Sequence, residues 1–325
     1  MIYLVALPPA TSSRESQADW LELCVLQSSS KKISVREYIR DLGIGGTADA
    51  VDLSAEPSGI PIDEDDTYES IGDDTFAEIN ERFEACGGAD GAYPFEIVGQ
   101  NVLQMRADMA TSAYVFMMLL SRFGKDAGPS RSKGAELFES LCAEAIRNYL
   151  GAVKSPGGQS IDTHSKSCVF GFPRRVLPSG FADAVDELCV ELREGIGHRV
   201  RPKLPDQKDG KLDIVAWKTF PDLREGKLIA FAQCATGQDW NEKITELPDV
   251  DRWCSYWMQD SPAVLPIRAF CVPHRIEFKQ WLQTAWYGGV LFDRCRIGYL
   301  SANIDESLSR KLARWSAYII RRLER

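Results

Sequence analysis

The sequence predicts an α/β protein: a mixed sheet flanked by helices, preceded by a mainly helical segment. Two observations predict it. After residue 135 the chain alternates amphipathic helical patterns with short apolar runs typical of strands, which is the order of an α/β domain. Before residue 124 most apolar residues recur at helical spacing.

The two parts meet in a stretch rich in small and turn-forming residues. Residues 124–130, Gly-Lys-Asp-Ala-Gly-Pro-Ser, end the strongly apolar pattern of 111–123. We therefore expect residues 1–128 to form an N-terminal, mainly helical domain that senses, regulates or docks. Residues 129–325 are expected to form the α/β domain.

In the first part, helical spacing predicts helices over 16–27, 34–42 and 111–123, and 93–105 is predicted as a strand or turn. The acidic stretch 62–74 lacks the ligand order of a calcium loop, so a solvated loop is expected. The alternative is that this stretch mimics phosphate charge and covers a basic groove. Glycine-rich 43–47 has no P-loop lysine and is predicted to be a loop.

The second part is expected to contain four helices and five strands. The helices are predicted over 136–150, 181–192, 277–286 and 307–323, and the strands over 168–172, 212–220, 227–235, 263–272 and 290–300. The turn-like residues 221–226 predict that the strands on either side pair as a hairpin.

Composition excludes several classes of protein. The formal net charge is −9, and residues 1–134 hold 22 acidic against 11 basic residues. The remainder is close to neutral, with basic clusters such as Arg174 and Arg175 that permit phosphate contacts. No apolar run is long enough for a membrane span, so a cytoplasmic protein is expected. The nine cysteines include no Cys-x-x-Cys pair, which predicts reduced, mostly buried thiols.

Polar residues at the ends of the predicted hairpin indicate chemistry. Asp213 lies at the start of one strand and Gln233 near the end of the other, with Lys243 a little beyond. A divalent cation prefers oxygen ligands, and a nearby lysine neutralises charge on an attacked phosphate. Asp239 and Glu242 form a capping-box pattern that would start a helix and place Lys243 in its first turn.

These residues resemble the motif of the PD-(D/E)xK, or restriction-endonuclease-like, nuclease superfamily, in the branch of Mrr-type restriction enzymes and nucleases of bacterial defence systems. The resemblance covers roughly residues 135–300 and implies a restriction-endonuclease-like mixed sheet. It implies that Asp213 and Gln233 bind Mg²⁺ or Mn²⁺. The family's lysine position holds Ala235, and Lys243 is expected to take over that role.

The resemblance also implies a third acid from a helix that precedes the core strands. We expect Glu139, in a Leu-Phe-Glu sequence, to supply it, with Glu187 as the alternative. The expected activity is metal-dependent hydrolysis of DNA, as an effector of bacterial anti-phage defence. A protein partner in a defence complex is expected, and any NTPase would be a separate subunit because the chain has no NTPase motif. RNA cleavage stays open, and the competing hypothesis is an inactive nuclease fold that binds DNA or a partner protein.

Overall fold

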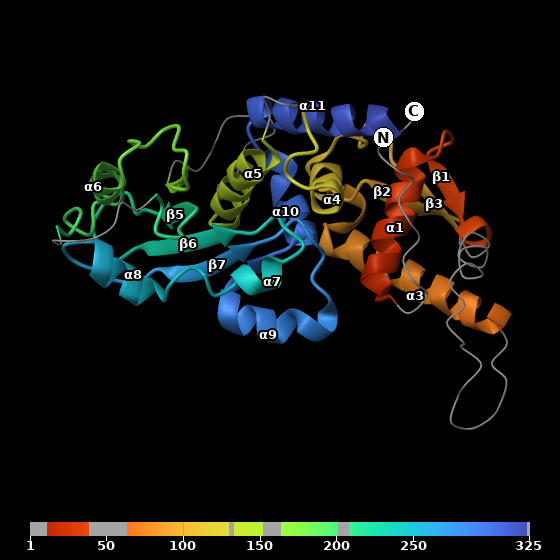
Figure 1. Ribbon diagram of the computed structural model, residues 1–325, viewed down its shortest axis with the longest axis horizontal. Helices are drawn as coiled ribbons and strands as arrows, with labels where there is room; N and C mark the ends of the chain where they lie inside the picture. The colour runs from red at the N-terminus through yellow and green to blue at the C-terminus, as the bar shows by residue number, and fades with distance from the viewer. Residues whose placement is uncertain are drawn as a thin grey trace, which may run out of the picture.

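The computed structural model describes residues 12–38, 64–99, 101–129, 133–151, 164–200 and 208–323. Within these ranges the chain is an α/β protein with a mixed sheet and flanking helices, as predicted, and it has a second, smaller sheet that was not predicted (Figure 1). The glycine-rich stretch 43–47 lies outside the described residues. In the described parts of the chain, no helix is both long enough and apolar enough to cross a membrane.

The larger sheet has five strands in the order β4-β5-β6-β7-β8. Their bounds are Ser165–Val169 (β4), Ile214–Lys218 (β5), Leu228–Cys234 (β6), Ile267–Cys271 (β7) and Val290–Phe292 (β8). The pairs β4–β5 and β5–β6 are antiparallel, whereas β6–β7 and β7–β8 are parallel. The predicted hairpin is confirmed, with Ile214 opposite Ala232 and Lys218 opposite Leu228.

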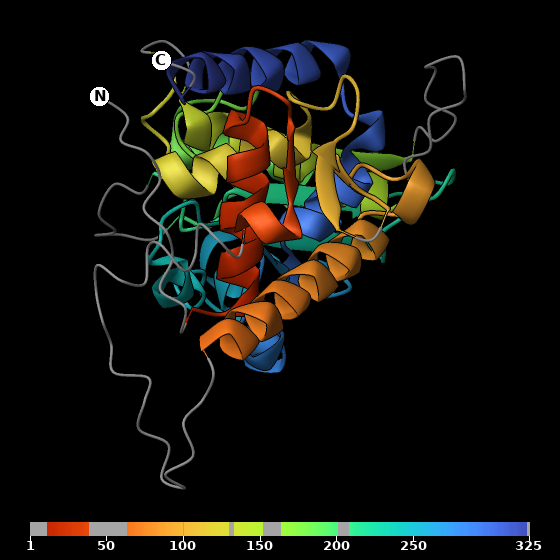
Figure 2. The ribbon, with the colours of Figure 1, turned by 90° about the vertical axis from the view of Figure 1, so that its right-hand side faces the viewer.

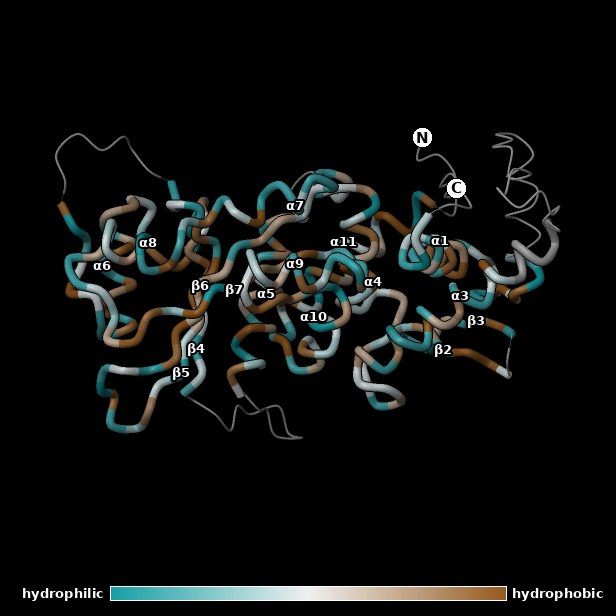
Figure 3. The backbone as a smooth tube through the Cα atoms, turned by 90° about the horizontal axis from the view of Figure 1, so that it is seen from below, coloured by the Kyte–Doolittle hydropathy of each residue, from teal (hydrophilic) through white to brown (hydrophobic). Residues whose placement is uncertain are grey.

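Alternation along β5 divides its side chains between two cores, because successive residues of a strand point to opposite faces. Ile214 and Ala216 join the largest core cluster, which includes side chains of α5 (Gly134–Tyr149). Val215 and Trp217 join a second cluster with α6 (Phe181–Leu192) and α8 (Val250–Trp257). Helices therefore cover both faces, and the tube in Figure 3 is hydrophobic along much of β6, in the middle of the sheet.

Four further helices surround this sheet. They are α4 (Ala113–Phe123), the short α7 (Trp240–Lys243), α9 (Phe278–Gly288) and α11 (Glu306–Leu323). Figure 1 shows α9 on the side of the sheet away from α5 and α11. The predicted helices over 111–123, 136–150, 181–192, 277–286 and 307–323 are confirmed; α8 was not predicted.

The N-terminal part contains a small sheet as well as helices. Helices α1 (Arg14–Gln27) and α3 (Glu64–Ala85) cross each other in Figure 2. Beside them, β1 (Lys32–Ser34), β3 (Val102–Met105) and β2 (Phe95–Val98) form an antiparallel sheet in the order β1-β3-β2. The helix predicted over 16–27 is confirmed, and the segment 93–105 is a hairpin.

Two stretches have a secondary structure that differs from the prediction. The stretch 290–300 is not one strand, because β8 ends at Phe292 and α10 (Arg294–Leu300) follows. Asp293 starts that helix, since its side chain accepts a hydrogen bond from the backbone N–H of Arg296 at 3.0 Å. The acidic stretch 62–74 is not a loop from residue 64 onward, because α3 begins there.

One hydrophobic core joins residues from both sides of position 128. The ring of Phe116 in α4 meets that of Trp315 in α11 edge to face, with centroids 5.1 Å apart. The buried guanidinium of Arg294 donates to both carboxylate oxygens of Asp19, at 2.7 and 2.9 Å. The division into domains 1–128 and 129–325 stays a prediction, and these contacts connect the two parts.

Candidate functional site

Two of the predicted acids lie together beside the large sheet, at the end where β5 begins. Glu139 projects from α5, and Asp213 immediately precedes β5. Gly171, two residues after β4, lies against both: a Cβ placed there would be 3.2 Å from Asp213 Oδ1 and 3.4 Å from Glu139 Oε2. The two carboxylates therefore face one small space, and both side chains are partly exposed.

The strand ends fix the position of Asp213. Its backbone carbonyl accepts hydrogen bonds from Phe170 N at 2.7 Å and Gly171 N at 2.9 Å, and its N–H donates to Ala232 O at 3.1 Å. Its side chain accepts from the backbone N–H of Cys234 at 2.7 Å through Oδ2. One carboxylate oxygen is thus held by the sheet, whereas Oδ1 faces Gly171 and Glu139.

Both carboxyl groups hold their protons more tightly than usual. Burial raises the pKa of Glu139 to about 8, helped by the nearby charge of Asp213 and opposed by that of Arg175. Burial likewise raises the pKa of Asp213 to about 7, against the stabilising hydrogen bond from Cys234 N–H and with a further contribution from Asp209. A divalent cation between the two oxygens would reverse this repulsion.

Neighbouring basic side chains already have partners. The guanidinium of Arg175 donates to Glu136 Oε2, and Lys133 pairs with Glu136 Oε1 at 3.1 Å. The guanidinium of Arg174 lies 4.7 Å from the ring centre of Phe170 and donates to Ser179 O at 3.0 Å. These contacts place a basic segment, residues 174–175, beside the acid pair, which sequence reasoning noted only as a charge cluster.

The amide oxygen of Gln233 is bonded elsewhere and does not join the acid pair. Gln233 is buried, and its Oε1 accepts a hydrogen bond from the backbone N–H of Leu247 at 3.1 Å. Its predicted role as a metal ligand stays a prediction and requires that bond to open. Ala235, at the position where the resemblance would place a lysine, is buried among apolar residues.

Lys243 is also engaged elsewhere. Its ammonium lies 3.4 Å from Asp239 Oδ2, and the side chain is 36% exposed. The predicted capping box is wrong in its first half, because the Asp239 side chain makes no cap hydrogen bond and α7 is a single turn of four residues. The alternative acid, Glu187, is exposed on α6, which packs on the opposite face of the sheet from α5.

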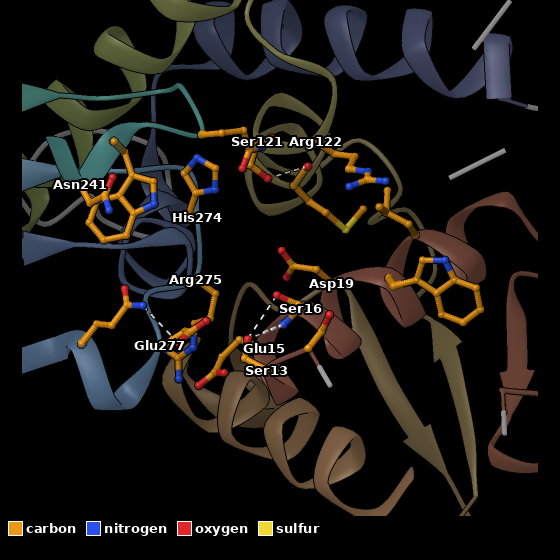
Figure 4. Close-up of a pocket in the computed structure, with 17 residues that line it drawn as sticks. Ser13, Glu15, Ser16, Asp19, Ser121, Arg122, Asn241, His274, Arg275 and Glu277 are labelled. Atoms are coloured by element: carbon orange, nitrogen blue, oxygen red, sulfur yellow. Dashed lines mark hydrogen bonds between the residues drawn. The ribbon is translucent and has the colours of Figure 1, made fainter. Parts of the chain in front are cut away.

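A second candidate is a polar cleft of about 570 Å³ between the N-terminal part and the C-terminal ends of β6 and β7. Figure 4 shows His274 and Asn241 on one side of this cleft and Asp19 and Glu15 on the other. Burial, then the charge of Arg294, lowers the pKa of His274 to about 4, so its imidazole is neutral at pH 7. Sequence reasoning missed this cleft because its residues come from segments more than 200 positions apart.

Sequence reasoning also missed a cluster of three thiols next to the acid pair. Cys142 of α5, Cys234 of β6 and Cys271 of β7 have their sulfur atoms within 4.8 Å of one another. The sequence contains no metal-binding spacing, because each cysteine comes from a different element. Cys142 lies one turn after Glu139 on the same helix, so the two groups are neighbours.

Comparisons with protein-family models, with curated proteins and with solved structures found no match for this chain.

Proposed function

We propose that this protein is a metal-dependent nuclease that hydrolyses DNA phosphodiester bonds. The observation that carries the proposal is the convergence of Glu139 and Asp213 on the space beside Gly171. The resemblance predicted these two acids, from a helix and from a strand start 74 positions apart in the sequence. A pair of carboxylates that share a partly exposed space is a suitable site for a hard divalent cation.

The order of elements supports a restriction-endonuclease-like core. Helix α5 is followed by β4, by helix α6, and by β5 and β6, which form an antiparallel sheet with β4; the helices α7 and α8 come next, and then β7, parallel to β6. Apart from α6, which is inserted between the first and second strands, this is the helix, three strands, helix, strand order that the resemblance implies. Within it Glu139 takes the place of the helix acid and Asp213 that of the first strand acid.

The residues fit Mg²⁺ or Mn²⁺ in part. Asp213 and Glu139 would hold the ion, which when bound activates a water and compensates charge on the attacked phosphate. Gln233 and Lys243 are each held by another partner, so their predicted roles require a closure on metal or DNA. Arg175 is a further candidate for a phosphate contact, because its charge acts on Glu139 and its side chain is 67% exposed.

The test is cleavage of plasmid and linear double-stranded DNA with Mg²⁺ or Mn²⁺, with RNA in parallel. We expect Asp213→Asn and Glu139→Gln each to lower the rate by roughly 100-fold or more, because each removes a charged ligand. Glu187→Gln is the matched control, since that acid is exposed on the opposite face. Undiminished cutting by Asp213→Asn would remove the basis of the proposal.

A second candidate function is an inactive nuclease fold that binds DNA or a partner protein. The specific observation in its favour is Ala235, buried where the family has its lysine, together with the pairing of Lys243 to Asp239. If the protein is an enzyme, Lys243→Ala should lose activity. If it is a binding module, neither wild type nor Lys243→Ala should cut DNA, and the variant should still bind it. A role in anti-phage defence with a protein partner follows only from the kind of nuclease proposed, and any NTPase would be a separate subunit.

A further inference from the structure

We propose that Cys142, Cys234 and Cys271 form a second metal site, which binds a thiophilic ion of the zinc type and joins α5 to β6 and β7. All three sulfur atoms lie within 4.8 Å of one another. The site uses sulfur, whereas the acid pair offers oxygen, so the two sites select different metals. It does not depend on nuclease activity.

The pairing register of two strands brings two of these thiols together. Cys234 and Cys271 are direct partners on the parallel strands β6 and β7. Cys142 faces them from α5, and the cluster belongs to the large core between that helix and the sheet. Neighbouring side chains in parallel register point to the same face, so two thiols come from the sheet and one from the helix above it.

The distances suit a metal bound by three thiolates. A tetrahedral ion with metal–sulfur bonds of about 2.3 Å requires sulfur atoms roughly 3.8 Å apart. Sulfurs that already lie within 4.8 Å need to close by about 1 Å at most. Cys142 and Cys271 are fully buried, and Cys234 is partly exposed as a residue; a tetrahedral ion held by the three thiolates would take water or another donor as its fourth ligand.

The three thiols interact with each other rather than behaving as separate apolar side chains. Burial opposes ionisation of Cys271, yet hydrogen bonds from the thiols of Cys142 and Cys234 lower its pKa to about 6. The pKa values of Cys142 and Cys234 are raised by burial. Metal binding would displace the thiol protons, because metal-bound thiols are deprotonated.

Other cysteines of the chain provide matched controls. Cys254 is equally buried but lies in the second core, on the other face of the sheet. Cys254→Ser therefore removes one buried thiol without touching the cluster. Cys142→Ser and Cys271→Ser each remove one proposed ligand and keep the side-chain size.

The experiment is to reduce and strip the full chain, then titrate it with Co²⁺ and with Zn²⁺. We expect about one equivalent of Co²⁺ to give a thiolate-to-cobalt charge-transfer band whose strength matches three thiolates, and Zn²⁺ to displace it. Cys254→Ser should behave as wild type, and Cys142→Ser and Cys271→Ser should bind at least ~10-fold more weakly. DNA is absent from this titration, so its result is separate from that of the cleavage test.

Two results would overturn the site. One is a wild-type protein with native far-ultraviolet circular dichroism that gives no charge-transfer band and no rise in Tm with Zn²⁺ or Cd²⁺. The other is zinc bound as tightly by both cluster variants as by wild type, which would place the ion elsewhere. The wild-type band decides the question even where a cluster variant fails to fold, since its strength reports the number of thiolate ligands.

Discussion

Glu139 and Asp213 make the stability of the folded protein depend on pH, because their ionised forms are disfavoured in the folded state. Their folded pKa values are about 8 and about 7, above the ordinary values of 4.5 and 3.8. For a carboxyl group whose pKa rises on folding, the associated stability is present below the unfolded pKa and is lost as pH rises through the folded pKa. The metal-free protein should therefore become less stable between about pH 5 and pH 8.

Glu139→Gln tests this directly, because glutamine resembles the protonated acid at all pH values. In EDTA at pH 8 we expect this variant to be more stable than wild type by on the order of 1 kcal/mol, or about 1–2 °C in Tm. The difference should shrink toward pH 5. Thermal scans from pH 5 to pH 9 measure it, and a Tm difference that does not vary with pH would contradict the assigned titration.

Gly171 provides a second test of the same space. A methyl group there would lie 3.2 Å from Asp213 Oδ1 and 3.4 Å from Glu139 Oε2, in the gap that a metal and its water would need. Binding of Mg²⁺ to the acid pair is expected to raise the Tm of the wild-type protein; Gly171→Ala should abolish that rise and lower DNA cleavage at least ~10-fold. Its Tm in EDTA should fall by much less than that of a core variant. Normal cleavage by Gly171→Ala would mean that the metal lies elsewhere.

At the scale of elements, the chain after α4 is packed against α11 at Gly128. A Cβ on Gly128 would lie 1.9 Å from Nε1 of Trp315 in α11, an overlap that requires movement. We expect Gly128→Ala to cost about 1–3 kcal/mol, as overpacking does. Urea unfolding measures the loss, and Trp315→Phe in the same chain should recover part of it. An unchanged midpoint would show that Gly128 is not tightly packed against Trp315.

The periodic elements were predictable from sequence, and those decided by short-range chemistry were not. Helix α6 matches its predicted bounds, 181–192, because apolar spacing and the glycines around it indicate the same limits. The strand predicted over 290–300 failed because the apolar residues continue past Asp293, where a side-chain cap starts a helix. A three-residue strand gives too little periodicity to distinguish it from the helix that follows.

The sequence predicted those site residues whose positions are set by the end of a strand or by the face of a helix. Asp213 and Glu139 meet because one starts a strand and the other faces the sheet from α5. The bond from Leu247 N to Gln233 depends on how the chain after β6 returns to the sheet, which no local pattern encodes. The thiol cluster depends in the same way on the register between β6 and β7.

At the scale of the whole molecule, buried ion pairs connect the N-terminal helices to one another and to residues that lie beside the large sheet. Glu22 of α1 is fully buried and accepts hydrogen bonds from Arg82 at 2.9 Å and from Tyr93 at 2.7 Å. Arg294, from the far end of the chain, binds Asp19 of the same helix. A buried ion that loses its partner costs roughly 3–5 kcal/mol, so these residues require both parts of the chain to be present.

We therefore expect residues 129–325, produced alone, not to fold to a stable state. Without α1 and α4 the guanidinium of Arg294 would lose Asp19, and Trp315 would lose its contact with Phe116. The full chain should unfold in one transition, with circular dichroism and tryptophan fluorescence coincident in urea. A fragment with a sharp transition of its own, or two separate transitions in the full chain, would instead establish two independent domains. The N-terminal part would then be a separate domain that docks reversibly on the part that carries the acid pair, rather than sharing one core with it.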